Sequence, residues 1–224
     1  RHSKNPMNDV RVRRAVAHSI DREGIVKSLV QGESIVVNSL CFPSQFGCTQ
    51  DVPNYDHNPE KAKKLLAEAG YPNGFEIPFL AYRNRDYAEA MINNLNAVGI
   101  KAKLEYLKYA AFRDKVQSGG SPFNFGTWGS YSINDVSAIT SHFQSGGKDD
   151  YSKDPEVIKQ LGIGDTSVDA NVRKAAYKAA LSRITGEVFM FPLWSYNTWY
   201  AFSKDVDFNP TPDEIPRFFT AKWM

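Results

Sequence analysis

The sequence has 224 residues, 42% of them hydrophobic, with 27 Lys and Arg against 25 Asp and Glu, a formal net charge of +2. This length and apolar content allow one large domain or two small ones with a full core, and the near balance of charge gives no argument for a nucleic-acid partner. No stretch approaches 18 consecutive apolar residues, so no membrane-spanning helix is predicted.

Two helices are predicted at the start of the chain. Asn8 or Asp9 can cap a helix over residues 10–20, and Asp21 can cap a second over residues 22–32. Side-chain oxygens of Asp and Asn satisfy the free amides of a first helical turn, which is why these residues mark helix starts.

An irregular stretch over residues 33–57 contains the two cysteines, Cys41 and Cys48. Pro43 and Gly47 favour a turn between them, so a disulfide closing this loop is predicted, worth roughly 2–3 kcal/mol in the chain-entropy model. It would indicate an oxidising compartment. The alternative is a pair of reduced thiols in a cytosolic loop. A zinc site is not expected, because no histidine stands at zinc-ligand spacing.

Helices and strands then alternate. Pro78 argues that the first strand lies at a sheet edge or carries a bulge, and the β-α-β-α-β order favours an α/β sheet with helices packed on it. The predicted elements are helix 58–70, strand 75–82, helix 85–99, strand 100–107, helix 109–119 and strand 123–128.

Three helical stretches are expected after residue 137, the last over residues 169–187 with Asp169 as its cap. Two more strands are predicted over residues 188–194 and 198–203. The tail from Asp205 has little periodicity and is expected to need another surface to lie on. On the last helix, the predicted buried face consists of Val172, Ala176, Ala179, Ala180 and Ile184.

Signatures of catalysis are missing from the sequence. The four histidines are not spaced as metal ligands, and no nucleophile elbow, phosphate loop or dinucleotide fingerprint occurs. No cofactor or metal is therefore expected, and the 13% aromatic content suits a ligand cleft better than turnover. Two alternatives stay open: a hydrolase that uses Asp135 or His142, and an interaction or sensing domain without a small ligand.

Four ordered segments carry a family resemblance: NPMNDVRVRRAVAHSIDREGIVKSLVQG, YDHNPEKAKKLLAEAGYPNGFEI, DYSKDPEVIKQL and FPLW. Together they resemble the carboxy-terminal lobe of the extracellular solute-binding proteins of ABC importers, family 5, the dipeptide, oligopeptide and nickel group. The resemblance implies an α/β, periplasmic-binding-protein-like lobe with a mixed sheet. Residues 1–204 would form this lobe, and residues 205–224 would return toward an amino-terminal lobe of the same protein.

The resemblance also implies a function without catalysis. Such a receptor would capture a small-molecule solute or short peptide by hinge closure and deliver it to an ABC permease in the inner membrane. It would be periplasmic, or extracytoplasmic and lipid-anchored, and would bind no nucleic acid.

The segment TWGSYSINDV, residues 127–136, bears on the solute. In peptide-binding relatives an aspartate three residues after the tryptophan grips the ligand's α-amino group. Here Trp128 is retained, but Tyr131 stands at that place and the first acid is Asp135. A buried ammonium without a carboxylate partner is costly, so a neutral or anionic polar solute such as an opine, oligosaccharide or metal chelate is favoured over a peptide.

The predicted ligand site gathers residues that follow strand ends, where open sheets bind ligands. Trp128 suits a core position as well as a site, and Trp194 and Asn197 also suit a structural role. The candidates are Tyr82, Arg83, Trp128, Ser130, Tyr131, Asn134, Asp135, Trp194 and Asn197.

Overall fold

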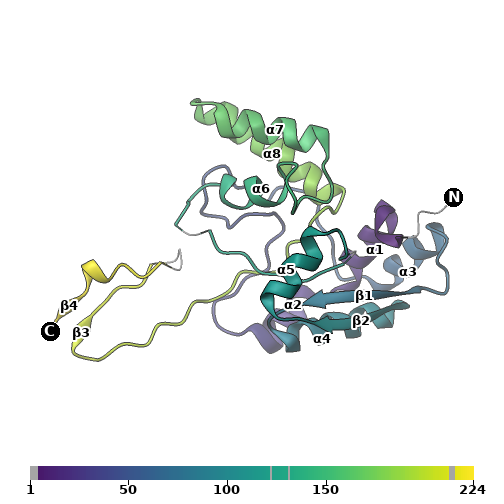
Figure 1. Cartoon of the computed structure of the whole chain (residues 1–224), viewed down its shortest axis with the longest axis horizontal. Coiled ribbons are helices and arrows are strands. Elements are labelled where there is room, and N and C mark those ends of the chain that lie inside the picture. Colours follow the sequence, from purple (N-terminus) through teal and green to yellow (C-terminus); the bar gives the residue numbers. More distant parts are fainter. Residues whose placement is uncertain (1–4, 122, 131, 212–214) are drawn as a thin grey trace.

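The polypeptide forms two packed groups of elements and a separate carboxy-terminal tail (Figure 1). The computed structural model describes residues 5–121, 123–130, 132–211 and 215–224. The first group contains α1 to α5 with strands β1 and β2, and the second contains α6 to α8. The α-helices are α1 (Val10–Ser19), α2 (Arg22–Ile25), α3 (Pro59–Glu68), α4 (Arg85–Ala97), α5 (Tyr109–Gln117), α6 (Ser137–Phe143), α7 (Pro155–Thr166) and α8 (Ala170–Gly186). The strands are β1 (Phe75–Ala81), β2 (Ile100–Tyr106), β3 (Val206–Asp207) and β4 (Lys222–Trp223).

Side-chain caps begin the helices where the sequence predicts them. Asp9 accepts a hydrogen bond from the Arg11 amide at 2.8 Å, and Asn58 accepts one from the Lys61 amide at 2.9 Å. Asp21 caps α2 as predicted, but from Val26 to Val30 the helix continues as a π-helical turn that periodicity alone does not reveal. Among the described helices, none is long and apolar enough to span a membrane.

Strands β1 and β2 run parallel, with Phe75 opposite Ile100 and Ala81 opposite Tyr106, and α4 connects them. On its other side β1 makes backbone bonds only at Leu80, to Phe123 and Phe125, among the described residues. Backbone groups alternate in direction along a strand, so Pro78 faces this same side and its missing donor interrupts no ladder. The predicted edge position of Pro78 is therefore confirmed.

Three segments that the sequence predicts as strands do not form strands in the structure. The 123–128 segment makes a single bridge, Leu80 with Asn124, because pairing ends before Gly126, which has no side chain to pack against a neighbour. The 188–194 segment makes one bridge, Val36 with Trp194, and contains Pro192, which has no amide donor. The 198–203 segment is extended without a ladder partner in the described part of the chain.

Helices α7 and α8 pack as an antiparallel pair over the second core (Figure 1). Asp169 caps α8 as predicted, accepting from the Asn171 amide at 2.7 Å. The predicted buried face of α8 is partly wrong: Val172 and Ala179 are exposed, whereas Tyr177 is fully buried because its ring fills the space beside Gly47 and Gly164. The buried residues of α8 are Ala176, Tyr177, Ala180, Leu181, Ile184 and Thr185.

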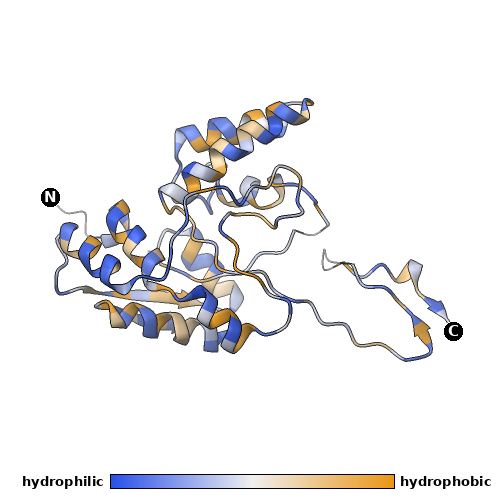
Figure 2. Ribbon diagram, turned by 180° about the vertical axis from the view of Figure 1, so that it is seen from behind, coloured by the Kyte–Doolittle hydropathy of each residue, from blue (hydrophilic) through white to orange (hydrophobic). Residues whose placement is uncertain are grey.

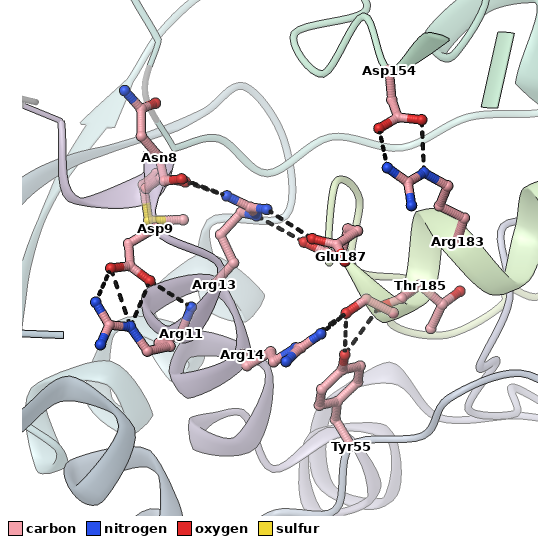
Figure 3. Close-up of polar contacts among 12 residues, drawn as sticks. Asn8, Asp9, Arg11, Arg13, Arg14, Tyr55, Asp154, Arg183, Thr185 and Glu187 are labelled. Carbon is pink, nitrogen blue, oxygen red and sulfur yellow. Dashed lines mark hydrogen bonds and ion pairs between the residues drawn. The ribbon is translucent and has the colours of Figure 1, made fainter. Parts of the chain in front are cut away.

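Polar contacts join the two groups at the end of α8 (Figure 3). The guanidinium groups of Arg13 and Arg14 donate to the carbonyls of Glu187 and Gly186, both at 2.8 Å. The Tyr55 hydroxyl donates to the Thr185 carbonyl at 3.1 Å. These bonds satisfy the last carbonyls of α8, which have no partner within the helix.

Asp154 at the start of α7 is predicted to contribute stability that acid removes. Its carboxylate receives two bonds from Arg183, both 2.7 Å (Figure 3), and these, together with the amides of the first turn, lower its pKa to about 2 from 3.8. Asp154→Asn keeps the cap but loses the ion pair, so we expect a loss of about 1 kcal/mol at neutral pH, small because Arg183 is partly exposed.

The sign of this effect follows from linkage. A depressed native pKa gives stability that is present above the unfolded value and is lost as the pH falls toward the native one. The difference between wild type and Asp154→Asn should therefore shrink between about pH 4 and pH 2, as measured by denaturant unfolding at several pH values. Glu60→Gln, at an exposed ion pair, is the control, and a difference as large at pH 2 as at pH 7 would contradict the assignment.

The predicted disulfide is present: Cys41 and Cys48 are bridged, with an Sγ–Sγ distance of 2.00 Å. Cys41 is 7% exposed and packs in the second core with Leu40 and Val136. The loop between the cysteines is paired to the segment that enters α6, because Phe46 bonds to Asn134 and Val136 on either side of Asp135. The bridge thus anchors a stretch of chain that has little regular structure of its own.

The tail leaves the body after the 198–203 segment and folds back on itself through β3 and β4 (Figure 1). Seen from behind in Figure 2, β3 and β4 lie away from the helices of both groups. The tail still contacts the body, where Arg217 Nη2 donates to the Ser132 hydroxyl at 3.4 Å. Large rings on the tail and on the segment leading to it face solvent: Trp199 is 80% exposed, Phe219 85% and Trp223 82%. Apolar rings at this density on an extended segment indicate a surface that packs against something else.

Candidate functional site

A hollow of about 2060 Å³ opens on the side of the first group where β1 ends. It is larger than the roughly 300–1,000 Å³ of a typical small-ligand pocket. Much of its lining comes from the disulfide loop, the end of β1, α5, the segment after Phe123, and the segment from Val188 to Tyr200. Further lining residues come from α1, α6 and the carboxy-terminal tail, where Pro210, Thr211 and Arg217 contribute. The carboxyl ends of parallel strands are where α/β sheets place ligands, so this hollow is the candidate site.

Most predicted site residues meet at this hollow. The carboxyl end of β1 contributes Tyr82, and the segment after Phe123 contributes three of the others. Arg83 and Asp135 are absent from the described lining residues, and Tyr131 lies outside the residues that the structure describes. The predicted residues that line the hollow are Tyr82, Trp128, Ser130, Asn134, Trp194 and Asn197.

Trp128 is the most exposed tryptophan of the predicted set, at 37%, compared with 7% for Trp194. Its indole stacks on the His142 imidazole, with centroids 4.4 Å apart and planes 23° apart. Phe143 meets it edge-on at 5.1 Å. Trp128 is therefore held by ring contacts at the wall of the hollow, whereas Trp194 packs in the core against Tyr87.

Thr127 ties the Trp128 segment to the end of β1. Its hydroxyl lies 3.0 Å from the Tyr82 hydroxyl and accepts a bond from Arg83 Nη1 at 3.1 Å. Arg83 is therefore linked to the hollow by its bond to Thr127, which is a lining residue. No sequence pattern points to Thr127, because its role depends on two segments that meet only in the folded chain.

The carboxylate of Asp135 is bonded to other residues of the chain and is not left open to a ligand. Arg173 Nη2 donates to its Oδ2 at 2.7 Å, and the Ser137 amide donates to Oδ1 at 2.9 Å. Partial burial alone raises the pKa of Asp135, but the bonds from Ser137 and Arg173 outweigh this and hold the pKa below its usual value. Its charge is already compensated, so it is poorly placed to receive a ligand ammonium.

The hydrolase alternative depends on Asp135 or His142, and each has a different neighbour. His142 Nε2 lies 3.4 Å from Asp149 Oδ2, whereas Asp135 faces Arg173. The Asp135 carboxylate also interacts with Ser137, both at its amide and at its side chain. In the same described ranges, no group of three His, Cys, Asp or Glu could hold a metal ion.

Residues 1–150 match the bacterial extracellular solute-binding proteins, family 5 (middle). The chain belongs to this family. The family 5 chain is 36% identical over 121 residues to the dipeptide-binding protein of Escherichia coli K12, covering 48% of this chain and 23% of that protein. It is 31% identical over 124 residues to heme-binding protein A of Haemophilus influenzae, covering 52% and 23%.

Solved structures confirm the predicted fold class. HbpA2 from Haemophilus parasuis superposes on the family 5 chain with a TM-score of 0.84 at 27% identity, over 97% of this chain and 45% of that one. MoaA from A. tumefacien R10, solved with mannopinic acid, gives 0.75 at 26% identity, over 85% and 41%. The chain therefore spans less than half the length of these relatives.

Proposed function

We propose that this chain is one lobe of the solute receptor of an ABC importer. In this proposal a small polar solute bridges two lobes, stabilises their closed arrangement and is delivered to a permease in the inner membrane. The receptor would be periplasmic, or lipid-anchored outside the cytoplasm, and the Cys41–Cys48 bridge fits that oxidising location. Family membership supports the proposal, and the hollow beside Trp128 carries it.

The size and openness of the hollow support a two-lobe site. A cavity well above the size of one small ligand, open on one face, is what a single jaw of a clamp presents. We propose that residues 1–204 form this jaw and that residues 205–224 return to the other lobe. The exposed rings of Phe219 and Trp223 would pack there.

The charges around the hollow favour a neutral or anionic solute. The described lining holds two carboxylates, Glu33 and Asp149. Asp149 lies 2.6 Å from Arg113, and Glu33 is on an exposed loop where water screens its charge. A buried ammonium would find no buried, unpaired carboxylate on these two residues, so an opine, oligosaccharide or metal chelate fits this lobe better than a peptide with a free amino terminus.

A thermal-shift screen of the full-length protein that contains this chain tests the proposal. A solute at 100 times its Kd should add about 2.7 kcal/mol of stability. N-acetylated dipeptides, opines and neutral disaccharides should outrank dipeptides with a free amino terminus. Trp128→Ala should weaken binding of the best solute by about tenfold or more, because a ring at the wall of a site supplies much of the contact.

Tyr106→Ala is the matched control, since this half-exposed ring on β2 lies away from the described lining. It should leave the affinity unchanged. Tight solute binding by the 224-residue chain alone would contradict a site shared between lobes. A full-length protein that no solute stabilises would contradict the receptor assignment.

A further inference from the structure

The carboxylate of Asp149 joins two helices beside the hollow. Arg113 Nη1 lies 2.6 Å from its Oδ1, and Arg113 Nη2 donates to Oδ2 at 2.8 Å. Gln117 Nε2 donates to the same Oδ2 at 3.3 Å, and His142 Nε2 lies 3.4 Å from it. Arg113 and Gln117 belong to α5, whereas His142 belongs to α6.

The Asp149 side chain is 8% exposed, so its charge is largely removed from water. Burial alone raises its pKa, but the bonds from Arg113 and Gln117 outweigh this and lower the pKa, so the carboxylate is ionised. Arg113 alone would neutralise it. The contact with His142 is therefore additional to what charge balance requires, and this contact leads to the candidate site.

The His142 side chain contacts both Asp149 and Trp128. The imidazole is stacked on one face of the indole, with a centroid distance of 4.4 Å. Phe143 closes the arrangement, lying edge-on to His142 at 4.5 Å and to Trp128 at 5.1 Å. The imidazole is thus packed on an indole that lines the wall of the hollow.

We propose that Asp149 is a positioning residue for Trp128 and acts through the His142 ring. Its carboxylate, clamped by Arg113, fixes the imidazole, and the imidazole fixes the indole surface offered to the solute. The role of the indole in solute binding rests on the proposed function. The positioning of the indole by Asp149 can be tested without any solute. Such preorganisation lowers the ordering cost of binding, because the ring does not have to be arranged when the ligand arrives.

The test is ¹⁹F NMR of the full 224-residue chain labelled with 5-fluorotryptophan. The chain has four tryptophans, and Trp128→Phe assigns the resonance of interest. Asp149→Asn keeps the size of the side chain but removes its charge. His142→Gln removes the stacked ring and leaves the Arg113–Asp149 pair in place, so it is informative even if Asp149→Asn folds poorly. Each variant should move the Trp128 resonance by more than its linewidth and leave the other three in place.

A double-mutant cycle separates positioning from a general structural effect. If Asp149 acts through His142, adding Asp149→Asn to His142→Gln should produce little further change in the Trp128 resonance. Asp149→Glu should restore most of the wild-type position. Glu76→Gln, at the exposed pair with Lys103, is the control and should move nothing.

Two results would overturn the proposal: a Trp128 resonance unmoved by Asp149→Asn in a folded chain, or equal and additive shifts in the cycle. Because no solute is present, neither result depends on what the receptor binds. Failure of the solute screen would leave this measurement intact, so the two proposals fail separately.

Discussion

Replacing Arg22 by methionine should lower the free energy of unfolding by about 3–5 kcal/mol, the largest single-residue effect that we expect in this chain, because several buried acceptors lose their donor. The Arg22 guanidinium is buried and donates to backbone carbonyls of three separate segments. It meets Val37 at 2.9 Å, Pro192 at 3.1 Å and Tyr55 at 3.2 Å. Two asparagine side chains, Asn38 and Asn54, accept further bonds.

The expected loss is large because methionine removes every one of these donors. Methionine fills a similar volume but leaves buried carbonyls without partners, and each such group costs about 1–3 kcal/mol. Burial lowers the pKa of Arg22, yet a guanidinium remains charged in proteins, so its bonds are charge-assisted. The ring of Phe191, with its centroid 4.8 Å from Cζ, covers one face of the group.

Denaturant unfolding of wild type and Arg22→Met measures this difference. Arg22→Lys should recover only part of it, because an ammonium cannot span acceptors arranged around a planar fork. Arg85→Met is the control: Arg85 is an exposed i,i+4 partner of Glu89, and its loss should cost less than about 1 kcal/mol. A loss below that value for Arg22→Met would mean that the irregular segments hold together without it.

Removing the disulfide should cost about 2–3 kcal/mol. Cys41→Ala with Cys48→Ala frees a short loop, so the unfolded chain gains conformational entropy that the bridge had removed. The native loop also loses its anchor beside the second core, where Cys41 is buried. Because Phe46 pairs with the 134–136 segment, the loosened loop should also weaken the wall of the hollow at Asn134.

Thermal unfolding with and without dithiothreitol checks this result. The reductant should lower the melting temperature of wild type to that of the double variant, and it should not affect the variant itself. Equal melting temperatures for oxidised wild type and the double variant would show that the bridge contributes nothing to stability.

Local signals in the sequence were sufficient for the helix starts and the parallel strand pair. Helix caps such as Asp9, Asn58 and Asp169 accept hydrogen bonds from amides two or three residues further along the chain. Both partners of each bond therefore lie within a short stretch of sequence, and the cap can be predicted from that stretch alone. The 188–203 region failed because its apolar run resembles a strand, whereas the fold uses it as an extended segment packed by side chains. Period and composition do not distinguish these two cases.

Part of the lining of the hollow could be predicted from the rule that ligand-site residues follow the ends of strands. Tyr82, Trp128 and Asn134 follow strand-like segments and do line the hollow. The bond between Asp135 and Arg173 joins residues 38 positions apart, so it could not be predicted from the sequence. The network of Asp149 likewise draws on α5 and α6, and no spacing rule connects those helices.

The position of Pro78 affects whether copies of this protein can associate through the outer edge of β1. On the outward side of β1, the Leu80 amide is already engaged and Pro78 offers no donor, so only Glu76 could begin pairing with a foreign strand. The charged side chain of Glu76 makes that approach still less favourable. This edge of β1 is consequently a poor template for edge-to-edge association, and concentrated solutions of the protein should not form fibrils through it.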